Sequence, residues 1–189
     1  MPVAPFVVAA FEPFAGRARN RSWEVVRRLP ARRGVRIVQL PVDFARLQDV
    51  IPRLMHPRPR GIVIVGEAPT DRVAVEQLAL NIIDTDRPDN AGARPQAKTI
   101  VPRGPLALRA SWDARALAAA LTADGTRAAA SFHAGTFACN AALYLALHEA
   151  AGRVPVGFLH VPYRRGANGV RMDALVRAVE AAVGALLVR

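Results

Sequence analysis

The fold is decided by an uninterrupted apolar run, Gly61-Ile62-Val63-Ile64-Val65-Gly66. Its β-branched side chains favour a β-strand, and no polar residue alternates with them. A strand of this kind is covered on both faces, as in parallel sheets that carry helices on either side. The run therefore predicts an α/β protein.

Short apolar strands alternate with amphipathic helices on both sides of this run. The other expected strands cover residues 5–10, 35–42, 127–132 and 154–161, and an extended segment with a bulge or kink covers 73–83. The expected helices are a short one capped by Ser22, one that begins at Asp43 and ends before Pro57, and three over 112–121, 137–150 and 172–187. This alternation predicts a three-layer α/β/α sandwich with a largely parallel (mixed) central sheet. No repeat or linker divides the chain, so we expect a single domain over residues 1–189.

One long segment, Asp84 to Pro105, has no periodic pattern. It is polar and rich in proline, glycine and arginine, which predicts an irregular loop. Loops of this length inside a compact domain are often functional.

The composition limits which partners and which cellular compartment are expected for the protein. The net charge is +11, but the arginines are scattered along the chain, so we expect a solvated basic surface and no specific nucleic-acid binding. The only cysteine excludes an internal disulfide and indicates a reducing compartment. No apolar segment is long enough to span a membrane, and the N-terminus lacks the pattern of a signal peptide. We therefore expect a cytoplasmic protein that does not bind membranes.

The single cysteine, Cys139, follows an expected strand end and a tight turn, and an apolar helix begins around it. Unpaired backbone N–H groups at a helix N-terminus favour the thiolate, which is the nucleophilic form of the side chain. A lone cysteine is more often a small buried hydrophobic residue. The catalytic interpretation therefore depends on what else lies near it.

Two other polar residues could complete a thiol-based site. His160 lies at the end of the late strand, and Glu76 lies among apolar residues of the kinked segment. A nucleophilic thiol needs a base, and that base benefits from a third group that fixes its tautomer. Taken singly, each has a simpler explanation, because the histidine could be a hydrogen-bonded core residue and the glutamate could face solvent.

The sequence shows no pattern for a metal or an organic cofactor. The spacing of His133, Cys139 and His148 matches no zinc motif. Gly16 follows the first strand without the other glycines of a dinucleotide fingerprint. We therefore expect neither a metal nor a cofactor.

Five short motifs, in order along the chain, carry a resemblance to a known family. They are Ala10–Gly16 followed by Asn20, Val75–Asn81, Pro88–Gly92, Ser131–Asn140 and His160–Pro162. Together they resemble the motifs of pyroglutamyl peptidase I, and the resemblance covers nearly the whole chain. It implies a cysteine exopeptidase that removes pyroglutamate from the N-terminus of peptides.

The resemblance also implies a role for individual residues. Cys139 would be the nucleophile, His160 the general base and acid, and Glu76 the residue that orients His160. Two phenylalanines would hold the flat pyrrolidone ring, and backbone groups near Gly66 and Ala68 would recognise its lactam. The substrate-binding residues implied in this way are Phe11, Phe14, Asn20, Gly66, Glu67 and Ala68. The family resemblance further implies a homo-oligomer, either a dimer or a tetramer.

Departures from the family pattern leave two alternatives open. The segment Glu67–Asp71 is one residue shorter than the usual family loop, and the segment after Tyr163 is also shorter. Because the resemblance implies that both regions face the substrate, one alternative is a cysteine hydrolase of the same fold that acts on another small amide or acyl group. The other is a non-catalytic binding homologue for an acidic partner, which retention on heparin at high salt would favour.

Overall fold

The apolar run lies in strand β3 (Gly61–Ala68), near the centre of a six-stranded sheet. The computed structural model describes residues 4–31, 34–163 and 170–187. The other strands of this sheet are β1 (Phe6–Phe11), β2 (Val35–Leu40), β4 (Val73–Glu76), β7 (Ala128–Ser131) and β8 (Val156–Pro162). The helices are α1 (Arg21–Val26), α2 (Phe44–Leu54), α3 (Ala114–Ala123), α4 (Ala138–Ala150) and α5 (Met172–Leu187).

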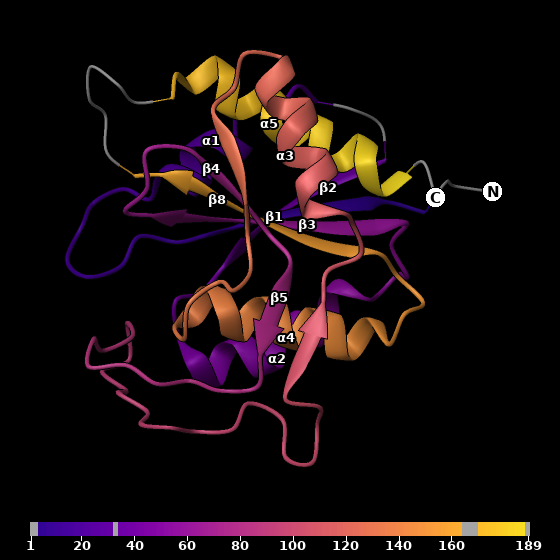
Figure 1. Cartoon of the computed structure of the whole chain (residues 1–189). Coiled ribbons are helices and arrows are strands. Elements are labelled where there is room, and N and C mark those ends of the chain that lie inside the picture. The colour runs from indigo at the N-terminus through magenta and orange to yellow at the C-terminus, as the bar shows by residue number, and fades with distance from the viewer. Residues whose placement is uncertain (1–3, 32–33, 164–169, 188–189) are drawn as a thin grey trace.

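The strand order is β2-β1-β3-β8-β4-β7. The first four strands of this order are parallel, and so are β4 and β7, whereas β4 runs antiparallel to β8. Figure 1 shows α2 and α4 on one face of the sheet and α1, α3 and α5 on the other. The predicted three-layer sandwich with a largely parallel, mixed sheet is therefore confirmed.

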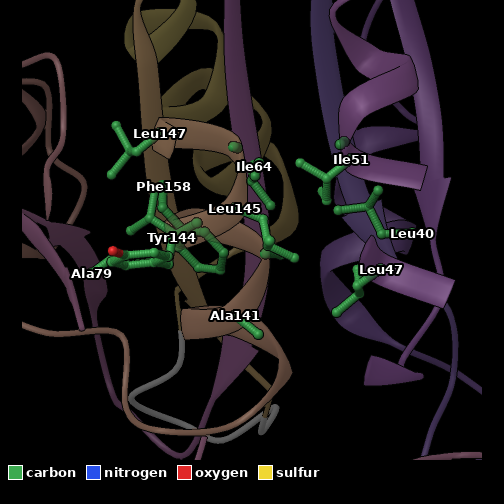
Figure 2. Close-up of a cluster of buried hydrophobic side chains, with 14 of the residues drawn as sticks. Leu40, Leu47, Ile51, Ile64, Ala79, Ala141, Tyr144, Leu145, Leu147 and Phe158 are labelled. Atoms are coloured by element: carbon green, nitrogen blue, oxygen red, sulfur yellow. The ribbon is translucent and has the colours of Figure 1, made fainter. Parts of the chain in front are cut away.

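Successive residues of β3 enter two different hydrophobic cores. Ile62 and Ile64 pack in the core on the α2 and α4 side, and Val63 and Val65 pack in the core on the α1, α3 and α5 side. Figure 2 shows the first of these cores, in which Tyr144 of α4 lies beside Ala79. Burial on both faces explains why this strand carries no polar alternation.

The kinked segment 73–83 separates into two strands at Gln77. Strand β5 (Leu78–Leu80) leaves the main sheet and pairs antiparallel with β6 (Ala107–Arg109), a strand that the sequence pattern did not indicate. The buried Gln77 side chain donates to the Trp112 carbonyl at 3.0 Å and accepts from the Ala114 N–H at 3.0 Å. These hydrogen bonds hold the point at which the chain changes sheets.

The start of α1 corrects one prediction. The N-cap is Asn20 rather than Ser22, because the Asn20 carboxamide oxygen accepts from the Ser22 N–H at 3.0 Å. An N-cap side chain satisfies an N–H that lies two or three positions further along the helix. The expected N-cap at Asp43 is confirmed for α2.

The expected long loop is confirmed, since no helix or named strand lies between β5 and β6. One end of this loop is held by Asn81, whose amide group donates to the carbonyls of Val101 and Gly104. In the described part of the chain, no helix is both long and apolar enough to cross a bilayer.

Candidate active site

The register of β8 with its two neighbours brings three candidate residues together. His160 is the direct partner of Gly66 in β3, and Phe158 is the direct partner of Glu76 in β4. Residues two apart on a strand point to the same face, as do directly opposed residues. The side chains of Glu76 and His160 therefore lie on the face of the sheet that α4 covers, beside Gly66.

His160 and Glu76 form a buried pair. The Nδ1 atom of His160 lies 2.8 Å from Oε1 of Glu76, and the side chains are 9% and 2% exposed, respectively. Because an ionised carboxylate only accepts hydrogen bonds, Nδ1 carries the hydrogen in this contact. The other ring nitrogen, Nε2, is thereby left to interact with a second partner.

That partner is Cys139, the second residue of α4. The helix begins after Phe137, whose backbone is extended and whose side chain makes no capping hydrogen bond. A hydrogen bond joins the Cys139 side chain to the His160 imidazole. A β-carbon placed on Gly66 would lie 2.9 Å from Cys139 Sγ and 3.1 Å from His160 Cδ2, so both side chains occupy the space above this glycine.

The surroundings of His160 change its protonation. Burial by itself lowers the pKa of the imidazole, but the charge of Cys139 and the hydrogen bonds to Cys139 and Glu76 outweigh burial and raise the pKa to about 10. The imidazole is therefore protonated near neutral pH. An imidazolium next to a sulfur atom stabilises the thiolate, which is the reactive form of cysteine.

A small pocket lies next to the thiol. Its walls are largely aromatic, and Phe137 packs against Phe14 at 6.0 Å between ring centroids and against Phe44 at 5.4 Å. The residues that line it are Phe11, Phe14, Asn20, Val42, Glu67, Phe137, Ala138 and Cys139. The pocket suits a flat, mainly apolar group held against the cysteine.

The charged residue in the pocket wall, Glu67, is paired. Its carboxylate accepts from the Arg21 N–H at 2.6 Å and forms an ion pair with Arg17. The Arg17 guanidinium carbon also lies 4.5 Å from the centroid of the Phe14 ring and 5.4 Å from that of Tyr163. This pair therefore connects strand β3 to the loop that carries Phe14.

The structure brings most of the candidate residues from the sequence to one place. Cys139, His160 and Glu76 form a chain of contacts above Gly66, and the pocket beside them includes the expected ring-binding residues Phe11, Phe14, Asn20 and Glu67. Ala68 lies outside the pocket lining, and its carbonyl accepts from the N–H groups of Thr70 and Tyr163. Its part in lactam recognition stays a prediction.

Four residues of this region were not among the candidates. Val42, Phe137 and Ala138 line the pocket, and Arg17 neutralises Glu67. Phe137 and Ala138 could have been found from their position directly before Cys139. Val42 follows β2, which neighbours β1 and Phe11, and it is the last residue of the strand expected over 35–42, so its position at a strand end was the available signal.

No group of three or more histidine, cysteine or carboxylate side chains with the arrangement of a metal site occurs among residues 4–31, 34–163 and 170–187.

Comparisons with known proteins identify similar sequences and structures. A sequence model of a family described as pyroglutamyl peptidase matches residues 5–187. The pyrrolidone-carboxylate peptidase of Thermococcus kodakarensis is 38% identical over 83% of this chain and 80% of its own. That of Chromobacterium violaceum is 36% identical over 97% of this chain and 92% of its own.

Solved structures resemble the whole fold. The pyrrolidone carboxyl peptidase from Thermus thermophilus superimposes with a TM-score of 0.89 at 33% identity, covering 95% of this chain and 99% of that one. Pyroglutamyl peptidase I from Bacillus amyloliquefaciens gives a TM-score of 0.88 at 28% identity and covers 98% of each chain.

Proposed function

The chain belongs to the pyroglutamyl peptidase family of cysteine peptidases, and from this premise we propose that Cys139, His160 and Glu76 are its catalytic triad. The reaction is the hydrolysis of the amide bond that follows an N-terminal pyroglutamyl residue. The observation that carries the proposal is the chain of contacts from Glu76 through His160 to Cys139 at the edge of an aromatic pocket.

In the first half of the reaction, Cys139 Sγ attacks the carbonyl carbon of the pyroglutamyl residue. The carbonyl oxygen gains negative charge, which unpaired N–H groups at the start of α4 stabilise. The C–N bond then breaks as His160 donates its proton to the leaving amine. The products of this half are a thioester on Cys139 and a peptide shortened by one residue.

In the second half, a water molecule attacks the thioester while His160 accepts one of its protons. The C–S bond breaks, free pyroglutamate leaves with a new carboxyl group, and the thiolate–imidazolium pair forms again. Glu76 keeps Nδ1 of His160 protonated throughout, so that Nε2 is the atom that exchanges protons with the reacting groups.

The pocket supports a neutral ring as the bound group. A pyrrolidone ring is flat, carries no charge, and presents one amide N–H and one carbonyl. Aromatic walls provide apolar contact for such a ring, and the ion pair with Arg17 offsets the charge of Glu67. Phe11, Phe14, Asn20, Gly66, Glu67 and Ala68 are proposed as the substrate-binding residues.

The proposal is tested with a fluorogenic pyroglutamyl coumarin amide. Wild-type protein should release the fluorophore, and Cys139→Ser and His160→Ala should abolish release. His133→Ala is the matched control, because His133 is exposed and lies in the loop before α4; it should keep full activity. No release by folded, reduced wild-type protein would overturn the pyroglutamyl assignment, and a panel of other blocked amides would then identify the acyl group.

Three broader expectations remain proposals. A single domain over residues 1–189 is supported by the family match over residues 5–187. A homo-oligomer is an expectation from the family resemblance, and sedimentation analysis tests it. A cytoplasmic location fits a reactive thiol that has to stay reduced.

A further inference from the structure

The motif Pro88-Asp89-Asn90-Ala91-Gly92 takes no part in the triad, yet it contacts two walls of the pocket. The Asn90 backbone N–H donates to the Val42 carbonyl at 2.8 Å. Its side-chain amide donates to Glu12 Oε1 at 2.9 Å and to the Pro13 carbonyl at 3.0 Å. Val42 is a pocket residue, and Pro13 directly precedes another, Phe14.

Glu12 completes the connection between these two walls. The oxygen that accepts from Asn90 also accepts from the Val42 N–H at 3.0 Å. The backbone carbonyl of Glu12 in turn accepts from the side chain of Asn20, the N-cap of α1 and a further pocket residue. Three separate segments are therefore joined at one point: the loop after β1, the segment after β2, and the long loop.

The position of Asn90 is itself fixed by its neighbour Asp89, which is buried. One carboxylate oxygen of Asp89 accepts from the N–H groups of Ala91 and Ala93, which closes the turn. The other accepts from the Phe44 N–H at 2.9 Å, at the start of α2. Because this carboxylate anchors the turn to the protein body, Asn90 reaches Glu12 from a fixed point.

We propose that Asn90 is a positioning residue for the substrate pocket, and that its amide group holds the Phe14 wall and the Val42 wall at the separation that a pyrrolidone ring requires. The inference rests on the proposed function of the adjacent site. Asn90 does not touch Cys139 or His160 in any described contact, so its effect falls on ring binding. Without the amide donors, Glu12 keeps its hydrogen bond from the Val42 N–H but loses the one from Asn90, so the Phe14 wall is held less firmly and the ring is bound less tightly.

The decisive variants are Asn90→Ala and the isosteric Asn90→Asp. Asn90→Asp keeps the shape but removes both donors and places a carboxylate against Glu12. For each variant we expect KM for the pyroglutamyl coumarin amide to rise about tenfold, as for the loss of one or two hydrogen bonds, while kcat falls less than about threefold. The double variant Glu12→Gln with Asn90→Asp restores an amide–carboxylate pair and should recover part of the KM.

A matched control is Asn81→Ala. Asn81 belongs to the same part of the chain and also ties down the long loop through its amide, but it binds Val101 and Gly104 instead of a pocket wall. This variant should lower the thermal midpoint and leave KM within about twofold of the wild type. Alkylation of Cys139 by iodoacetamide should proceed at the wild-type rate in all of these variants, because the thiol and imidazole are unchanged.

Hydrogen exchange separates this inference from the proposed function. In Asn90→Ala, the backbone amides of residues 11–20 and 42–44 should exchange faster than in the wild type, and those of 100–104 should exchange at the wild-type rate. In Asn81→Ala, the amides of 100–104 should exchange faster, and those of 11–20 and 42–44 should not change. Exchange that follows this pattern with a rise in KM supports the inference. If Asn90→Ala leaves hydrogen exchange at residues 11–20 and 42–44 unchanged, or lowers only kcat, the inference is overturned. Inactivity of the wild type overturns the proposed function alone, and the exchange pattern then decides whether Asn90 positions the pocket walls.

Discussion

Gly66 and His160 are direct partners in the parallel ladder between β3 and β8, and the absence of a side chain at Gly66 gives the Cys139 thiol its approach to the imidazole. A β-carbon on Gly66 would lie 2.7 Å from the Phe158 ring, 2.9 Å from Cys139 Sγ and 3.1 Å from His160 Cδ2. The first two distances are shorter than real contacts of a β-carbon. A single methyl group at this position must therefore move the thiol, the imidazole or the ring behind them.

Gly66→Ala should inactivate the enzyme without unfolding it. A displacement of the thiol from the imidazole by a fraction of an ångström to about 1 Å lowers kcat/KM by about 100-fold, because the proton transfer and the attack both depend on that geometry. Steady-state kinetics with the pyroglutamyl coumarin amide measures the loss. Circular dichroism checks that the fold persists.

Two other glycines serve as controls for this variant. In Gly157→Ala the new methyl group meets the Trp112 ring at 2.4 Å, so the protein should lose stability while the triad keeps its geometry. In Gly184→Ala the methyl group meets nothing within 4 Å. Because alanine has a better helix propensity than glycine, the free energy of unfolding should rise by about 0.5 kcal/mol. Equal losses of activity in Gly66→Ala and Gly157→Ala would show that the effect is general destabilisation.

Glu76→Gln should slow catalysis far more than it lowers affinity. The amide group of glutamine can donate to Nδ1 of His160 and so select the tautomer with its hydrogen on Nε2, which cannot accept a proton from the reacting groups. The expected loss of kcat is on the order of 10³-fold to 10⁴-fold, with KM little changed. Asp49→Asn, which removes an exposed carboxylate in α2, is the control and should keep wild-type kinetics. A Glu76→Gln enzyme within about threefold of the wild type would exclude an orienting role.

The protonation of His160 predicts a specific dependence of stability on pH. Its pKa is raised from 6.5 to about 10 in the folded protein, where burial opposes the shift and Cys139 and Glu76 cause it. The folded state therefore keeps a proton that the unfolded chain releases. The resulting stabilisation is fully present below pH 6.5 and is lost as the pH rises through about 10, so its contribution to the free energy of unfolding decreases across that interval.

Nuclear magnetic resonance of the imidazole carbons tests this directly. The His160 signal should report a charged ring at pH 8 in the wild type. In Cys139→Ala its midpoint should fall, because the charge that most strongly raises the pKa is removed. A wild-type midpoint near 6.5 would contradict the raised pKa of His160.

The features predicted from the sequence are those that depend on short-range pattern. The run at residues 61–66 identified a strand buried on both faces, because each of its side chains enters a core regardless of which neighbours supply it. The cap at Asp43 was predicted for the same reason, since its contact with the Arg46 N–H is local. The residues of the proposed triad were singled out because thiol, imidazole and carboxylate are rare in apolar surroundings and because their motifs resemble those of a family.

The features that were missed depend on contacts between distant segments. Strand β6 is short and partly exposed, and it exists because Gln77 redirects the chain so that β5 pairs with it. Val42 lines the pocket and forms hydrogen bonds with Asn90 and Glu12, which lie far away in the sequence. Contacts of this kind leave no periodic pattern in the sequence.

The pair formed by Arg17 and Glu67 gives the last prediction. Arg17→Met removes the cation and leaves the buried carboxylate with its hydrogen bond from the Arg21 N–H. An unpaired buried charge costs several kcal/mol, but the Arg17 side chain is 36% exposed, so we expect a loss of only about 1–2 kcal/mol in the free energy of unfolding. KM should also rise, because Arg17 covers one face of the Phe14 ring.

Glu67→Gln distinguishes charge pairing from shape in this prediction. Its carboxamide oxygen still accepts from the Arg21 N–H and no charge is buried, so Glu67→Gln should be less destabilising than Arg17→Met, and the double variant should be more stable than Arg17→Met alone. A double-mutant cycle by urea denaturation measures the coupling. Additive effects of the two changes would mean that the two side chains are neighbours without an energetic interaction, and the Phe14 wall would then depend on packing rather than on this ion pair.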